Sequence, residues 1–163
     1  MSTDPFRLVE QASIRHADNR GYLDVLYEQG EVVLKRSFST AGVFRGMHWQ
    51  RPPHSQTKLI RVVSGRILDF VVSPATTPPA IHYRELTPSD GWIQIDAHLA
   101  HGFYALEDTE FEYLCHGAYN EAAEASFSIE AFLRSELRLP LITMSAKDRG
   151  ATPLKVVDGG KTT

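Results

Sequence analysis

Short strand-like segments separated by turn residues dominate the chain between Gly30 and Tyr119. The segments are rich in β-branched and aromatic residues, which predicts β-strands, and the glycine, proline, serine and aspartate residues between them predict turns. Many short strands at this spacing are typical of an all-β barrel or a double-sheet jelly roll. We therefore predict an all-β jelly-roll barrel, with one more strand before it at residues 21–28. The strands expected in the main region are residues 31–39, 42–50, 57–65, 66–74, 81–87, 91–106 and 110–119.

The length of 163 residues suits one domain, and 42% hydrophobic with 23% charged residues is the balance of a soluble globular protein. We predict a single domain over residues 1–163. The sequence changes character after Tyr119, and we expect residues 120–155 to form short helical segments, with one helix opening in "SAKDRG" (145–150). The closing "GGKTT" predicts a frayed tail.

Charge and targeting signals point to an ordinary intracellular protein. The formal net charge of −3 argues against nucleic acid or membrane as a main partner. No apolar run approaches the roughly 20 residues that span a bilayer, and the N-terminus lacks the pattern of a signal peptide. The single cysteine, Cys115, cannot form an internal disulfide. We expect a cytoplasmic protein with no nucleic-acid or membrane partner.

The segment "GVFRGMHWQ" (42–50) is apolar on both faces of a strand and still carries Arg45 and His48, which indicates a lined cavity. Imidazole titrates near neutral pH, so His48 suits a general base; the alternative is a core histidine bonded to a backbone carbonyl. Gly46 would leave room for a ligand to approach. Regular alternation puts Phe44, Gly46, His48 and Gln50 on one face. Arg45 then needs a bulge, a strand end or a partner subunit to reach the same cavity.

Three further residues have a chemical and a structural interpretation each. Lys58 could stabilise a negative charge that develops on a ligand, or it could be a strand charge that faces water. Tyr119 could deliver a proton to a carbanion, or its hydroxyl could lie in solvent. Asp148 has a helix cap as its default role.

His98 and His101 raise the question of a metal site, because imidazole is a common metal ligand. The two residues are three apart, which puts them on opposite faces of a regular strand. His48 is followed by tryptophan and glutamine, so the His-x-His pair usual in metal-binding barrels is absent there. We expect no metal.

Five stretches together resemble the dTDP-4-dehydrorhamnose 3,5-epimerase family, and the first of them is "DNRGYLDVLYE" (18–28). The most specific is G-V-x-R-G-x-H followed by Q-x-K-L-x-R-V-x-x-G; the others are "AHGFYAL", "YLCHGAY" and "SAKDRGATPL". The resemblance implies a metal-free jelly roll of the cupin type without a cofactor, paired into a homodimer through N-terminal strands within residues 1–40. It also implies an isomerase that inverts C3, C5 or both of a 4-keto-6-deoxy nucleotide-diphosphate sugar through an enolate.

The resemblance implies a role for each matching residue. His48 matches the base, Asp148 its partner, and Lys58 the lysine that steadies the enolate. Tyr119 matches the acid on the opposite sugar face, and His101 the second histidine of the pocket. The residues matching positions that hold the nucleotide sugar are Arg45, Gln50 and Gln56.

The chain also departs from the family pattern. "VLKR" (33–36) replaces a Gln-x-Asn-like set near the nucleotide, so the base could be other than thymine, and action at one centre stays open. Further departures lie at 71–76, 96–99 and 125–133. The alternatives are a nucleotide-sugar 3,4-ketoisomerase on the same barrel, a metal-dependent cupin oxygenase and a non-catalytic sugar-binding barrel.

Overall fold

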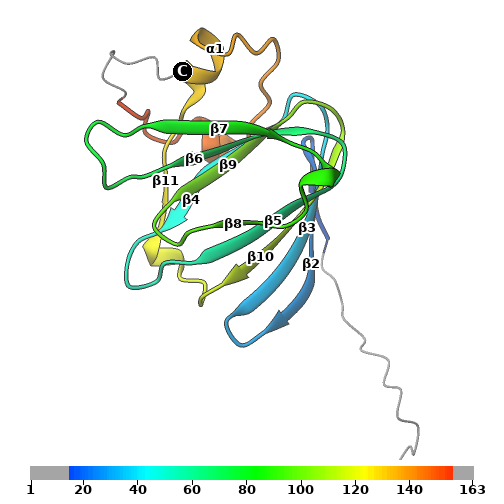
Figure 1. The fold of residues 1–163 in the computed structure, drawn as a ribbon, viewed down its shortest axis with the longest axis vertical. Helices are drawn as coiled ribbons and strands as arrows, with labels where there is room; N and C mark the ends of the chain where they lie inside the picture. Colours follow the sequence, from blue (N-terminus) through cyan, green and yellow to red (C-terminus); the bar gives the residue numbers. More distant parts are fainter. Residues whose placement is uncertain (1–14, 156–163) are drawn as a thin grey trace, which may run out of the picture.

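Two antiparallel β-sheets face each other in the computed structural model, which describes residues 15–155 (Figure 1). The first sheet has the strand order β1-β2-β3-β10-β5-β8 and the second β11-β4-β9-β6-β7. The predicted all-β jelly roll is confirmed. The strands are β1 (Arg15–Asp18), β2 (Gly21–Gln29), β3 (Val32–Ser39), β4 (Phe44–Gln50), β5 (Thr57–Ser64), β6 (Ile67–Val72), β7 (Ile81–Leu86), β8 (Ile93–Ile95), β9 (Ala100–Ala105), β10 (Thr109–His116) and β11 (Glu124–Ser126).

The predicted strands are present, with one difference. The segment 91–106 forms two strands, β8 and β9, which belong to different sheets. The chain turns between them, where the backbone N–H of Leu99 donates to the carbonyl of Asp96 at 3.0 Å. One apolar run therefore contributes a strand to each of the two sheets.

The prediction of helical segments over 120–155 is only partly right. Short helices occur at α1 (Glu130–Ser135) and α2 (Ala146–Arg149), and the second matches the expected helix in "SAKDRG". Residues 124–126 instead form β11, which pairs with β4. A free strand edge offers unpaired backbone groups, and the chain satisfies them here rather than continuing a helix. The "GGKTT" tail lies outside the described residues.

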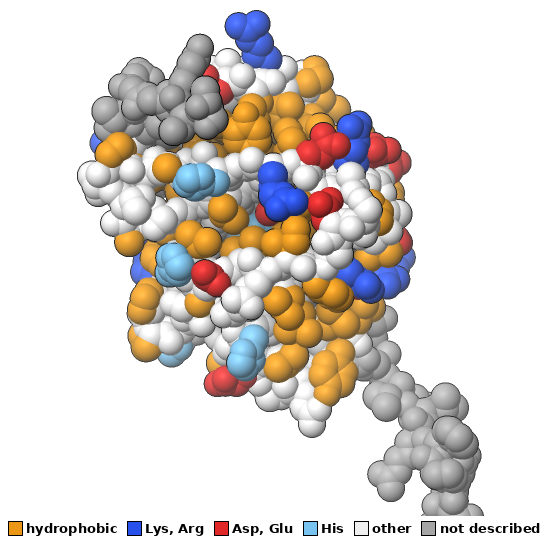
Figure 2. Space-filling model, viewed as in Figure 1, with side chains coloured by type: hydrophobic (Ala, Val, Ile, Leu, Met, Phe, Trp, Pro, Cys, Tyr) orange, Lys and Arg blue, Asp and Glu red, His pale blue; other side chains and the backbone are white. Residues whose placement is uncertain are grey.

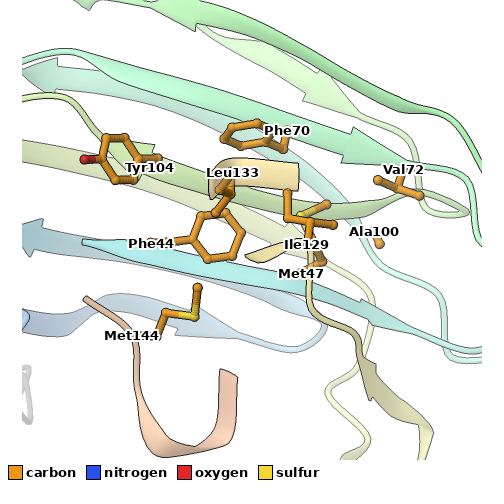
Figure 3. Close-up of a cluster of buried hydrophobic side chains, with 9 residues drawn as sticks. All are labelled: Phe44, Met47, Phe70, Val72, Ala100, Tyr104, Ile129, Leu133 and Met144. Atoms are coloured by element: carbon orange, nitrogen blue, oxygen red, sulfur yellow. The ribbon is translucent and has the colours of Figure 1, made fainter. Parts of the chain in front are cut away.

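Two hydrophobic cores lie on opposite faces of the second sheet. The inner core fills part of the space between the sheets and contains Ile60, Val62, Ile67, Leu86, Ile95, Phe103 and Phe111. The outer core packs the other face of the sheet against the C-terminal segment, where Leu133 of α1 lies over Phe44 and Phe70 (Figure 3). Its members are Phe44, Met47, Phe70, Val72, Ala100, Tyr104, Ile129, Leu133 and Met144. The outer core thus fixes the C-terminal segment against the back of β4.

Basic, acidic and hydrophobic side chains are interspersed over the face of the molecule shown in Figure 2. Within residues 15–155, no helix has the length and apolar character needed to cross a bilayer.

Candidate active site

A β-bulge in β4 brings Arg45 and His48 to the same side of the sheet. Arg45 lies opposite Phe103 of β9 and His48 lies opposite His101, so β4 uses one residue more than its partner between these pairs. An extra residue reverses the alternation of side chains. Both polar residues therefore face the space between the sheets. Of the three routes predicted for Arg45, the structure uses the bulge.

The bulge also corrects two predictions about this strand. Phe44 does not share a face with His48, because it packs in the outer core with Met47. Gly46 does not leave room for a ligand: a Cβ there would lie 2.6 Å from the Cα of Gly102. Gly46 also has a φ of 134°, a backbone conformation that residues other than glycine rarely adopt. The glycine permits two strands to approach closely.

His48 and Asp148 form a short, charge-assisted pair. The Nε2 atom of His48 lies 2.6 Å from Oδ1 of Asp148, whose side chain is 1% exposed while that of His48 is 34% exposed. The other carboxylate oxygen accepts the backbone N–H of Gly46 at 3.3 Å. With Nε2 bonded to the carboxylate, Nδ1 is the imidazole nitrogen left to accept a proton.

Asp148 reaches this position because of how α2 begins. Ser145 caps the helix, and its Oγ accepts the backbone N–H of Asp148 at 3.0 Å. The serine performs the capping role that Asp148 had as its default prediction, so the aspartate side chain is free to turn to His48. Burial alone raises the pKa of Asp148, but the hydrogen bond and positive charge of His48, with the Gly46 N–H, hold that pKa below its usual range.

A cavity of about 260 Å³ lies in front of His48. Every predicted site residue except Asp148, which stands behind His48, lines this cavity: His48, Lys58, Tyr119, Arg45, Gln50, Gln56 and His101. The opposite wall is the first sheet. Lys58 of β5 donates from Nζ to the backbone carbonyl of His48 at 3.1 Å, and burial lowers the pKa of the Lys58 ammonium.

Tyr119 lies at the mouth of the cavity. The residue is 63% exposed, and its hydroxyl donates to Oε2 of Glu124 at 3.0 Å. Glu124 also accepts Nζ of Lys147 at 2.7 Å, so the tyrosine belongs to a polar cluster at the rim. Burial of part of the ring and the neighbouring carboxylate raise the pKa of Tyr119.

Tyr113 is a site residue that the sequence predictions missed. It lies on β10, in the sheet opposite His48, and lines the cavity two residues from the cavity-lining Cys115. Burial raises the pKa of its phenol far above the usual range, so the group is protonated at neutral pH. Alternation along "TEFEYLCH" puts Phe111, Tyr113 and Cys115 on one face, a signal that could have identified it.

The two predicted glutamines are bonded to backbone groups. Gln50 donates to the carbonyls of His54 and Ala118 at 2.5 and 3.1 Å, and its Oε1 accepts the N–H of Asn120 at 2.9 Å. Gln56 donates to the carbonyl of Gly117 at 2.8 Å. Gln50 in particular uses both amide donors and its oxygen to hold the loop that carries the mouth tyrosine.

Two further predicted residues have defined partners. The Nε of Arg45 donates to Oγ of Ser39 at 2.9 Å, and a terminal nitrogen donates to the carbonyl of Phe38 at 3.2 Å. His101 lies 2.6 Å from Oδ1 of Asp69, and both side chains are buried. A second imidazole–carboxylate pair therefore borders the cavity through His101, and the sequence predictions named only the histidine.

Among residues 15–155, no three His, Cys, Asp or Glu side chains come together in a group that could hold a metal ion. His98 and His101 illustrate this: the first lies in an exposed turn and the second in the buried strand β9.

A family model described as dTDP-4-dehydrorhamnose 3,5-epimerase matches residues 8–156 of the chain. The enzyme of that name from Mycobacterium tuberculosis is 38% identical over 93 residues, which are 54% of this chain and 46% of the relative. A dTDP-4-dehydrorhamnose 3-epimerase from Streptomyces niveus is 32% identical over 54% of this chain and 45% of its own. The matched stretches thus span about half the length of these curated relatives.

Solved structures of similar proteins extend the likeness to nearly the whole chain. The crystal structure of dTDP-4-dehydrorhamnose 3,5-epimerase from Sulfolobus tokodaii has a TM-score of 0.64 and 30% identity, and covers 88% of this chain and 90% of that one. The enzyme of that name from Elizabethkingia anophelis has a TM-score of 0.62 and 26% identity, with 90% and 95% covered.

Proposed function

The chain belongs to the dTDP-4-dehydrorhamnose 3,5-epimerase family, and we propose that it inverts C3, C5 or both of a 4-keto-6-deoxy sugar carried on a nucleoside diphosphate. One observation carries the proposal: the buried Asp148 holds His48 at 2.6 Å, and His48 and Lys58 line the same cavity of about 260 Å³. A base, its orienting carboxylate and a cation for the developing oxyanion are the groups this reaction needs.

The geometry supports a defined sequence of proton transfers. The 4-keto group acidifies the hydrogens on C3 and C5, because the carbanion formed there spreads onto the ketone oxygen. Nδ1 of His48 takes such a hydrogen, and the Asp148 carboxylate stabilises the imidazolium that results. Lys58 stabilises the enolate oxygen more than the neutral ketone, and this difference lowers the barrier.

We assign the return of the proton to Tyr113 and a binding role at the mouth to Tyr119. Both phenols line the cavity, but Tyr113 comes from the sheet that faces His48, whereas Tyr119 is 63% exposed and its hydroxyl is bonded to Glu124. Protonation from the face opposite His48 inverts the carbon centre. This assignment is an alternative to the acid role that the family resemblance implied for Tyr119, which stays a prediction.

Hydrogen exchange tests the function directly. The protein is incubated with a 4-keto-6-deoxy nucleotide sugar in deuterated water, and deuterium at C3 and C5 is followed by NMR. Label at both carbons indicates a double epimerase and label at one a single-centre epimerase; no label indicates a binding protein and refutes the proposal. Conversion to a 3-keto product would indicate a ketoisomerase. His48→Asn should abolish the exchange while the fold is kept.

The two tyrosines form a matched pair for assigning the acid. Tyr113→Phe should slow inversion at least tenfold while wash-in of deuterium by the base persists, because general acids contribute about 10²–10⁴-fold. Tyr119→Phe should leave the ratio of inversion to wash-in unchanged. The opposite result would return the acid role to Tyr119.

We further propose that the protein is a single-domain cytoplasmic homodimer. The support is the family membership, and Cys115 is a free, buried thiol that fits a reducing compartment. Light scattering of the purified protein would test the dimer, and a monomer at micromolar concentration would refute it.

A further inference from the structure

The inner wall of the cavity carries two polar side chains of β3 that the proposed reaction does not use. Lys35 lies opposite Tyr113 and Ser37 lies opposite Phe111 in the β3–β10 pairing, so both point to the inner face of the sheet. Both line the cavity. Lys35 belongs to the segment 33–36, in which the sequence departs from the family pattern.

Ser37 is buried without a hydrogen-bond partner. It is 1% exposed, and its Oγ is the single buried side-chain oxygen or nitrogen without a partner among residues 15–155. A buried hydroxyl without a partner costs free energy, and such groups commonly find their partner in a bound ligand or water. Ser37 lines the cavity although its Oγ is enclosed, so a ligand in the cavity satisfies this hydroxyl once the serine side chain rotates toward it.

Lys35 differs from the other cations of the cavity within the described part of the chain. Arg20 is paired with Asp18, Arg45 donates to Ser39 and to a backbone carbonyl, and Lys58 donates to the carbonyl of His48. The Nζ of Lys35 lies over the Tyr113 ring, 5.8 Å from its centroid, and forms no ion pair with a carboxylate of residues 15–155. Its ammonium is therefore available to an anionic ligand.

The positions of the two lysines suggest which anion Lys35 meets. Lys35 and Lys58 come from β3 and β5, which flank β10 on either side. Two strand spacings, about 10 Å, separate the two backbones, and the lysines are offset along the strands by two residues, because Lys35 lies opposite Tyr113 and Lys58 opposite Cys115. Carbons 1 and 4 stand at opposite ends of a pyranose ring. If Lys58 holds the oxygen on carbon 4, as the proposed function requires, the phosphate on carbon 1 lies toward the other lysine.

We propose that Lys35 and Ser37 form an oxyanion subsite that binds the sugar-linked phosphate of the nucleoside diphosphate. The ammonium supplies charge and three donors, and the hydroxyl supplies a further donor that has no partner within the protein. The inference rests on the proposed function for the orientation of the sugar. It predicts that the terminal phosphate of a free nucleoside diphosphate occupies the same subsite.

Calorimetric titration with dTDP and dTMP tests the subsite without requiring catalysis. UDP and UMP are titrated in parallel because the proposed function does not specify the nucleobase. Wild-type protein should bind the diphosphate more tightly than the monophosphate in at least one series. Lys35→Met should weaken the diphosphate by about ten- to hundredfold and leave the monophosphate nearly unchanged, since a charge-assisted hydrogen bond is lost with one phosphate only. Ser37→Ala should have a smaller effect in the same direction.

Two controls separate this role from a general effect of charge. Lys35→Arg keeps the charge and should retain most of the preference for the diphosphate. Lys155→Met removes an exposed lysine outside the cavity and should leave the preference unchanged. The proposal is overturned if Lys35→Met weakens binding of both ligands equally, or of neither; a lysine that binds a carboxylate on the sugar would give the second result. It is also overturned if wild-type protein shows no preference for the diphosphate in either series. Failure of the epimerase proposal would appear separately, as absent deuterium exchange in wild-type protein.

Discussion

Replacing Asp148 by asparagine changes the chemistry behind the base while almost preserving the shape of the side chain. The carboxylate oxygen lies 2.6 Å from Nε2 of His48 and is buried, so water screens its charge much less than at the surface. A hydrogen bond to a charged group contributes about 1.5–3 kcal/mol. At about 1.4 kcal/mol per tenfold in rate, loss of this stabilisation of the imidazolium alone slows proton abstraction by about 10- to 150-fold.

The asparagine amide has a second effect. Its N–H can donate to Nε2, which moves the imidazole proton to Nδ1 and removes the lone pair that would take the substrate hydrogen. The same exchange in a serine-protease triad costs about 10⁴ in rate. We therefore expect deuterium exchange into the 4-keto sugar to fall by about 10²- to 10⁴-fold in Asp148→Asn.

The assay is the initial rate of deuterium wash-in by NMR, at saturating substrate, with thermal unfolding measured on the same sample. A folded Asp148→Asn variant that exchanges within threefold of wild-type protein would refute the assignment of His48 and Asp148 as base and orienting group. A variant with an altered fold would be replaced by Ser145→Ala, which removes the cap that positions Asp148.

The same variant gives a pH prediction for stability. The pKa of Asp148 is lower in the folded protein than the unfolded value of about 3.9, so its contribution is fully present above about pH 4 and is lost as the pH falls through the folded pKa. Acid denaturation of wild-type protein should accordingly be steeper below pH 4 than that of Asp148→Asn. Identical acid profiles would contradict this.

Three other substitutions follow from the contacts described. Gly46→Ala should destabilise the folded protein by about 2–4 kcal/mol and reduce exchange, because the new methyl would overlap Gly102 and a φ of 134° is strained for alanine. Gly30→Ala is the control: no atom lies within 4 Å of its new methyl, so it should lower Tm less. Lys58→Met should abolish exchange yet raise Tm by about 2–4 °C, since a buried ammonium is removed. In wild-type protein the pKa of Lys58 is lowered, so activity should be lost at an alkaline pH below the usual lysine pKa of about 10.4. Glu112→Gln should destabilise by about 2–4 kcal/mol, because this buried carboxylate holds two arginines on the outer face, without changing the exchange rate per folded molecule.

The alternation and spacing of residues were enough to predict the class of fold and most strands. Runs such as "TKLIRVVSG" have a local composition that fits only a strand, and their turn residues mark the ends. The motif around His48 also carried the family resemblance, and seven of the eight predicted site residues line one cavity. Strand composition and the motif around His48 are local, so the sequence alone could determine them, and the site residues followed from the resemblance that the motif carries.

Other features depended on contacts between distant segments. At the bulge around Gly46, β4 pairs with β9 and the backbone N–H of Gly46 donates to Asp148, and alternation within residues 42–50 could name a bulge only as one of three routes for Arg45. The places of Tyr113 and Tyr119 have the same origin: both residues belong to one strand-like motif, and the packing of the two sheets puts Tyr113 on the cavity wall in β10 and leaves Tyr119 exposed at the mouth. The pattern of side chains along the chain determines the strands, whereas the packing of one sheet against the other determines which side chains line the site.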